Sequence, residues 1–114
     1  MSVAKTNPTP VTVRIRVVPD PARPPAAHLI FEPEVLWCHP EDRIQWMCDD
    51  GPFVIEFLRS TPLGKMHFHS SENRTVPIAV PRRAARGRYH YAVAVCSEGI
   101  VQIDAGCPEI IIED

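Results

Sequence analysis

Proline is the residue that most constrains how this chain folds. Thirteen of the 114 residues are proline, and they recur along most of the sequence. Proline lacks a backbone N–H and fixes its own φ angle, so it interrupts helices and is excluded from the middle of sheets. The composition therefore argues against long helices and favours short strands joined by stiff turns. We expect an all-β protein.

Apolar and polar residues alternate along several segments, as they do in strands with one buried face. In the first segment, Val11 to Val17, the polar positions are Thr12, Arg14 and Arg16. The other expected strands are Ile44–Cys48, Phe53–Phe57, Met66–Phe68, Val76–Val80, Tyr89–Val95, Ile100–Ile103 and Ile110–Ile112, with His28–Cys38 extended around Pro33. This spacing predicts a β-sandwich of about seven to nine strands, with at most one short helical turn at Ala84–Arg86.

Length, charge and the first residues set further bounds. A chain of 114 residues suits a single domain, 1–114, and we expect residues 1–10 to form a flexible tail. No apolar run approaches the roughly 20 residues that span a bilayer, so no membrane span is expected. The net charge of −2 gives no overall attraction to nucleic acid. The start MSVAKTNPTP lacks the apolar stretch of a secretory signal, which predicts a cytoplasmic protein.

The four cysteines are expected to be thiols, because no CxxC pair suggests structural zinc and the cytoplasm is reducing. Cys38 and Cys48 stand at opposite ends of an expected hairpin and are too far apart to bridge, so we expect buried thiols. Cys96 and Cys107 flank the IVQID strand and could approach each other. Whether those two pair is left open by the sequence.

Two stretches together resemble a known family. The run FEPEVLWCHPEDRIQWMCDDGPFVIEF is followed about thirty residues later by GRYHYAVAV and a last strand. An F-x-P segment, an acidic turn, a strand with Trp, a turn into a strand ending in Phe, and G-x-Y-x-Y resemble the cupredoxin pattern of plastocyanin and azurin. The resemblance covers most of the chain and implies a cupredoxin-like Greek-key β-sandwich.

The resemblance also shows what this chain lacks. Copper-binding cupredoxins have a ligand histidine where this chain has Phe53. Their other ligands, a cysteine, a histidine and commonly a methionine, follow the tyrosine-containing strand, and together they suit type 1 copper. Here the last histidine is His90 and the last methionine is Met66, so nothing after Cys96 or Cys107 completes the set. The resemblance therefore implies the fold without type 1 copper, and we expect no cofactor.

A different metal site is an alternative. His67 and His69 fall on one face of an expected strand, and two imidazoles at that spacing chelate zinc or copper when a third donor converges. His39, His90 or a thiol could supply that donor. The simpler interpretation is that both histidines face solvent opposite Phe68.

The chain has one concentration of positive charge, formed by Arg82, Arg83, Arg86 and Arg88. Guanidinium groups suit phosphate and carboxylate, so an anion or nucleic-acid site is a second alternative. No aromatic residues interleave with these arginines in the way that a nucleic-acid groove requires. Pairing with acids of the same chain, such as Glu109, Glu113 and Asp114, is the interpretation that we favour, and nucleic acid is not an expected partner.

Catalytic motifs are missing from the sequence. No G-x-S-x-G, P-loop, dinucleotide or HExxH pattern occurs, and the adjacent Asp49 and Asp50 are typical turn residues. We expect a nonenzymatic binding or assembly module with an unknown protein partner, a second copy of the chain being one candidate. The outward side of the expected strand over Tyr89–Val95 becomes small and apolar towards Ala92 and Ala94, which suits either packing under a loop of the same chain, the simpler interpretation, or a surface where a second copy or another protein docks.

Overall fold

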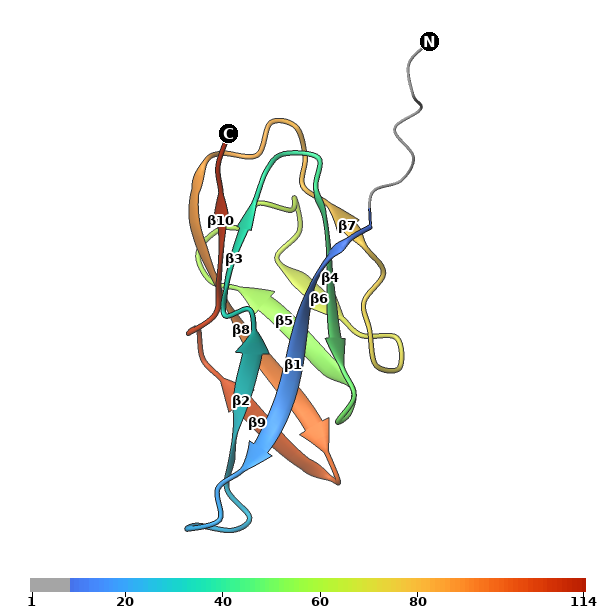
Figure 1. The fold of residues 1–114 in the computed structure, drawn as a ribbon, viewed down its shortest axis with the longest axis vertical. Helices are drawn as coiled ribbons and strands as arrows, with labels where there is room; N and C mark the ends of the chain where they lie inside the picture. Colours follow the sequence, from blue (N-terminus) through green and yellow to red (C-terminus); the bar gives the residue numbers. More distant parts are fainter. Residues whose placement is uncertain (1–8) are drawn as a thin grey trace.

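The computed structural model describes residues 9–114, which form two β-sheets packed face to face (Figure 1). The smaller sheet has the order β2-β1-β4-β7, and it lies in front of β5, β8 and β9 in the view of Figure 1. Its strands are β1 (Val11–Pro19), β2 (Ala27–Glu32), β4 (Arg43–Cys48) and β7 (Ile78–Ala79). β1 pairs antiparallel with β2 and parallel with β4.

The larger sheet has the order β3-β10-β8-β5-β6, and β9 pairs with β8 beside β10. Its strands are β3 (Val35–Cys38), β5 (Phe53–Phe57), β6 (His67–His69), β8 (Gly87–Ser97), β9 (Ile100–Asp104) and β10 (Glu109–Ile112). Within residues 9–114 there is no helix, so the expected all-β sandwich is confirmed. The described chain has ten strands, slightly more than expected.

The extra strand comes from the segment expected to be continuous over His28–Cys38. The structure divides it at Pro33 and Glu34, so that β2 pairs with β1 in one sheet and β3 pairs in parallel with β10 in the other. Proline has no N–H to continue the ladder, which explains why the chain changes sheets there.

The expected strand over Val76–Val80 is too long, and the helical turn that the sequence allowed before β8 is absent. Only Ile78 and Ala79 of the segment Val76–Val80 pair with β4, and the side chain of Val76 is 71% exposed. Pro77 and Pro81 flank this short strand and cannot donate to a ladder. The helical turn at Ala84–Arg86 does not form; instead the N–H of Ala84 donates to the carbonyl of Pro81 at 3.0 Å, closing a turn.

The core between the sheets is centred on aromatic rings. Trp46 lies 5.5 Å from Tyr91, 6.3 Å from Phe57 and 6.1 Å from Phe68 between ring centroids. Trp46 and Tyr91 are fully buried. Burying an aromatic or aliphatic side chain of this size contributes about 1.5 to 3 kcal/mol, so this cluster holds the two sheets together.

The turn before β5 requires a glycine. Gly51 has a φ of 157°, and a Cβ atom there would lie 2.0 Å from the carbonyl oxygen of Cys96. The turn therefore packs directly against the end of β8, and the N–H of Cys96 donates to the carbonyl of Pro52 at 2.9 Å. This contact fixes the start of β5 beside β8.

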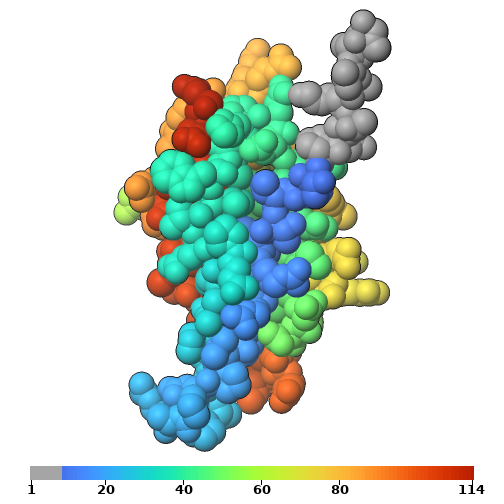
Figure 2. All heavy atoms as spheres, viewed as in Figure 1, coloured from blue at the N-terminus to red at the C-terminus, as the bar shows by residue number. Residues whose placement is uncertain are grey.

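The expected tail over residues 1–10 lies mostly outside the described residues, and Thr9 and Pro10 precede β1 without joining a strand. At the other end of β1, the loop over residues 20–26 projects from the body of the sandwich (Figure 2). Among the described residues, no helix is long and apolar enough to cross a membrane.

Candidate functional site

Phe53 occupies a position in the core. It begins β5, is 3% exposed and pairs with Val95 of β8, which is also buried. Its N–H donates to the hydroxyl of Ser70 at 3.0 Å. An apolar ring therefore fills the position where the family resemblance places a ligand histidine.

The residues around Phe53 do not fit a type 1 copper centre. Cys96 is exposed and lies on the opposite side of β8 from Val95, and Cys107 is exposed beyond β9. Both are free thiols in the structure, as are the buried Cys38 and Cys48. No group of three His, Cys, Asp or Glu side chains in residues 9–114 is placed to hold a metal ion.

His67 and His69 precede and follow the buried Phe68 in β6, and both are exposed on the same face of the strand, as alternation predicts. Nδ1 of His67 is 3.8 Å from a carboxylate oxygen of Glu56, and Nδ1 of His69 is 3.3 Å from the carbonyl of Ser70. Neither of the other histidines proposed as a third donor joins them. The pair thus presents two imidazoles without a third ligand among the described residues.

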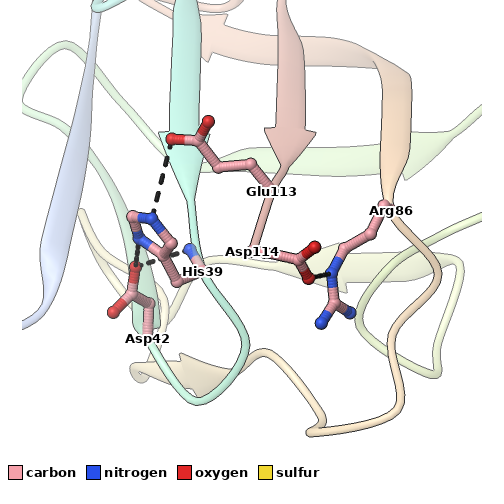
Figure 3. A network of polar contacts seen from close by, with 5 residues as sticks. All are labelled: His39, Asp42, Arg86, Glu113 and Asp114. Carbon is pink, nitrogen blue, oxygen red and sulfur yellow. Dashed lines mark hydrogen bonds and ion pairs between the residues drawn. The ribbon is translucent and has the colours of Figure 1, made fainter.

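His39 instead belongs to a polar network at the end of the sandwich where β10 finishes (Figure 3). Its backbone N–H donates to Asp42 at 2.8 Å, and its ring nitrogens lie 3.7 Å from Asp42 and 3.6 Å from Glu113. Arg86 forms an ion pair with Asp114 in the same region. These contacts tie the β3–β4 turn to the residues that follow β10.

Three of the four clustered arginines are paired with acids. Arg82 contacts Glu41 at 2.7 Å, Arg86 contacts Asp114, and Arg88 contacts Glu109 at 3.3 Å. Arg83 is exposed and has no acidic partner within residues 9–114. Arg88 lies on β8 and the other three lie in the preceding loop, and the three paired arginines contact three different acids.

The outer face of the larger sheet, which points away from the core, carries apolar side chains in two clusters, one on β5, β8 and β9 and one on β3, with Arg88, His90 and Glu109 between them. Val54 lies opposite Ala94 in the ladder, and Ala94 lies opposite Ile103, so side chains from β5, β8 and β9 form one row. We use the term docking face for the outward apolar side chains of this sheet: Val35, Trp37, Val54, Leu58, Ala92, Ala94, Val101 and Ile103.

The docking face contains most of the exposed hydrophobic surface of the described chain. Nine large hydrophobic side chains are exposed in residues 9–114, and only Met66, Val76 and Ile100 lie outside the docking face. Of the six within it, Ile103 is 69% exposed and Trp37 is 55% exposed. Monomeric soluble proteins rarely leave apolar side chains gathered in this way without a function.

A shallow hollow crosses the docking face. It has a volume of about 300 Å³, and Val54, Ala94 and Val101 contribute to its lining. His69 and Cys96 also border it. The small side chain of Ala94 creates the depression between its larger neighbours, so the surface offers a groove to an approaching side chain.

Trp37 marks the other end of the docking face. In the register of the sheet it lies beside Ile111 of β10, and Ile111 lies beside Arg88 of β8. Ile111 is only 7% exposed, although it points away from the core, because its neighbours cover it. The neighbour of Trp37 in the ladder is therefore an apolar side chain.

Sequence reasoning found one strand of this surface and missed the rest. It identified the small outward residues of β8, but it did not identify Trp37, Val54, Val101 or Ile103. A signal was present in VLWC and FVIEF, where Trp37 and Val54 place apolar residues at positions that alternation assigns to solvent. The register that joins these strands was not available from the sequence.

The strand order identifies the fold. All strands of the described chain lie in two sheets, β2 and β3 continue one segment across both, and β10 returns between β3 and β8. The fold is an all-β sandwich of two sheets, the architecture that the family resemblance implied. A solved structure described as a novel purple cupredoxin from Nitrosopumilus maritimus is similar to this chain, with 15% identity, 88% of this chain and 98% of that chain covered, and a TM-score of 0.46.

At that identity and TM-score, no residue role or activity is transferred from the purple cupredoxin to this chain. No family model matches the sequence, and no curated protein matches it either.

Proposed function

We propose that this cupredoxin-like chain is a noncatalytic binding or assembly module that contacts another protein through the docking face. The observation that carries the proposal is the gathering of six of the nine exposed large hydrophobic side chains on one side of one sheet.

The composition of the docking face suits protein recognition. Interfaces are enriched in aromatic residues at their centre, and tryptophan is among the residues that most often dominate binding energy. Trp37 supplies such an anchor, and the groove at Ala94 supplies a complementary depression. A partner that covers both would remove apolar area from water, which contributes about 25 cal/mol per Å² before the costs of association.

Charged groups lie on the same face as the apolar side chains, and in the register of the sheet Glu109 and His90 stand between Val35 of β3 and strand β5. Glu56 and His67 approach each other at 3.8 Å, and Glu109 lies 3.3 Å from Arg88 and 3.8 Å from His90. Both signs of charge are therefore represented, and neither forms a block. This pattern favours an apolar protein partner with a mixed polar rim over a polyanion such as nucleic acid.

The proposal is tested with charge substitutions that differ only in their location. Trp37→Glu and Val54→Glu each place a carboxylate in the docking face, and Val76→Glu places one at an exposed apolar residue outside it. Immobilised wild-type and variant chains are used to capture proteins from native lysate, and circular dichroism checks that each variant is folded.

We expect specific proteins to be retained by the wild type and Val76→Glu and to be lost with both docking-face variants. We expect this loss of binding because the partner would have to bury an unpaired carboxylate in the interface, which costs free energy. Equal capture by all four chains contradicts the proposal, as does loss with Val76→Glu alone.

A further inference from the structure

β9 is an edge strand whose outward backbone groups have no partner in the described residues. It pairs with β8 alone (Figure 1). Glu98 and Gly99 form the two-residue turn between these strands, both with positive φ, so Ser97 and Ile100 are the hydrogen-bonded pair that closes the hairpin. Hydrogen-bonded and non-hydrogen-bonded pairs alternate along an antiparallel ladder, so Val101 and Ile103 belong to non-hydrogen-bonded pairs with β8. Their N–H and C=O groups therefore point away from β8.

The other sheet edges are less available for pairing. β7, β6 and β3 have two, three and four residues. β2 is longer, but Pro25 and Pro33 stand close to its two ends and His28 and Glu32 are exposed on it. Short strands, proline and charge are the usual means by which proteins block edge pairing.

β9 lacks these protections. It has five residues, no proline and no lysine, and its one charge, Asp104, accepts hydrogen bonds from the N–H groups of Gly106 and Cys107. The side chains of Val101 and Ile103 are 59% and 69% exposed. Such an exposed apolar edge either finds a partner strand or promotes aggregation.

We propose that the partner at this edge is β9 of a second copy, paired antiparallel about Gln102. Val101 of one copy then lies opposite Ile103 of the other, and their outward N–H and C=O groups form four intermolecular backbone hydrogen bonds. The two Gln102 side chains face each other, and Asp104 lies opposite Ile100, so no like charges meet. The IVQID sequence is self-complementary in this register.

This inference rests on the proposed function, because it names a second copy as one partner of the assembly module. Pairing of the two β9 strands joins two larger sheets into one, with β8 and β5 of each copy flanking the junction. The docking faces of both copies become continuous. β2 lies next to β9 in the opposite sheet without forming a ladder with it.

The first experiment removes a hydrogen-bond donor that the monomer does not use. Ile103→Pro deletes the outward N–H of Ile103, and edge strands tolerate proline at such positions. Each symmetric dimer loses two of its four intermolecular bonds, so we expect the dissociation constant to rise at least about tenfold. Sedimentation equilibrium at about 100 μM detects pairing of the modest affinity that small interfaces give.

The second experiment tests the register. Gln102→Glu and Gln102→Lys each place two like charges opposite each other, so each variant alone should be monomeric, whereas an equimolar mixture should form a one-to-one heterodimer. In a background with Cys96→Ser and Cys107→Ser, Gln102→Cys should form an intermolecular disulfide on oxidation, because directly opposite residues of a non-hydrogen-bonded pair lie about 4.5 Å apart.

The outcomes separate this inference from the proposed function. A wild-type chain that stays monomeric, or a dimer that survives Ile103→Pro and the single charge variants, overturns the pairing of β9. A dimer lost with Val54→Glu and unaffected at Gln102 indicates face-to-face packing instead, and also overturns it. In both cases capture of partners that depends on Trp37 leaves the proposed function standing.

Discussion

The two sides of β8 show how one strand meets two different demands. On the inner side Tyr89, Tyr91, Val93 and Val95 are all buried. On the outer side Arg88 and His90 give way to Ala92, Ala94 and Cys96, which are smaller and partly or fully exposed. Large side chains on the inner side fix the sandwich, and small ones on the outer side leave room for another molecule.

The two tryptophans express the same contrast. Trp46 on β4 is fully buried and touches three other aromatic rings, whereas Trp37 on β3 is 55% exposed. Comparison of inner and outer residues of one type therefore separates stability from recognition.

The largest expected effect is a difference between the tryptophans. Trp46→Ala leaves a cavity in the aromatic cluster and should reduce the free energy of unfolding by about 3 to 5 kcal/mol, while Trp37→Ala should change it by less than about 1 kcal/mol. Urea unfolding followed by circular dichroism measures both. Equal losses of stability would show that the docking face is part of the core.

The cysteines should differ between inside and outside in their response to pH. Burial, followed by the negative charge of Asp42, raises the pKa of Cys38 from 9.0 to about 12. The folded state keeps this thiol protonated when the unfolded chain would already lose its proton, so stability falls as pH rises from about 9 to about 12, by up to roughly 1.4 kcal/mol per pH unit.

The measurement for Cys38 is the urea midpoint between pH 8 and pH 11, with Cys38→Ala as the comparison. The variant should lose less stability over this range than the wild type, although its midpoint at pH 8 is lower. Parallel curves for wild type and Cys38→Ala contradict the assignment.

A smaller effect distinguishes the two inner tyrosines. The hydroxyl of Tyr89 donates to the carbonyl of Ala85 at 2.6 Å, whereas the buried hydroxyl of Tyr91 and the buried indole N–H of Trp46 face each other outside normal hydrogen-bond geometry. Tyr89→Phe should therefore destabilise by about 1 kcal/mol, and Tyr91→Phe should be neutral or stabilising by up to about 1 kcal/mol. Thermal unfolding of both variants measures the difference, and a destabilised Tyr91→Phe contradicts the expectation.

The smallest effect is expected at the exposed ion pairs. Arg82→Gln and Arg86→Gln each break a contact on the surface, with Glu41 and Asp114 respectively. Such pairs contribute about 0 to 1 kcal/mol and are screened by salt. Unfolding at low and high ionic strength measures the change, and a loss above about 2 kcal/mol would mean that the loop before β8 is held by these charges.

The sequence predicts the inner side of this fold well. Alternation identifies Val13, Ile15, Tyr91 and Val95 as core residues, because only one side of a half-buried strand is apolar. Alternation also identifies Phe53, Ile55 and Phe57 as the buried side of β5. Each of these predictions depends on a few neighbouring residues, which is why the sequence contains them.

The docking face depends on distant residues and was only partly predictable. Ala94 acquires Val54 and Ile103 as neighbours through pairings of β8 with β5 and β9. Alternation assigns a side to each strand but does not set the register between strands. The error at Val76 has a local cause instead, because Pro77 and Pro81 cannot donate to a ladder and leave only Ile78 and Ala79 to pair with β4.

The position of β10 has a consequence for how the protein is made. This last strand lies in the middle of its sheet, with β3 on one side and β8 on the other. Synthesis adds roughly 5 to 20 residues per second. Until β10 emerges, the backbone groups of β3 and β8 that pair with it have no partner strand. The nascent chain is thus most vulnerable to pairing with other chains before β10 emerges, because the larger sheet is completed only when this strand is inserted.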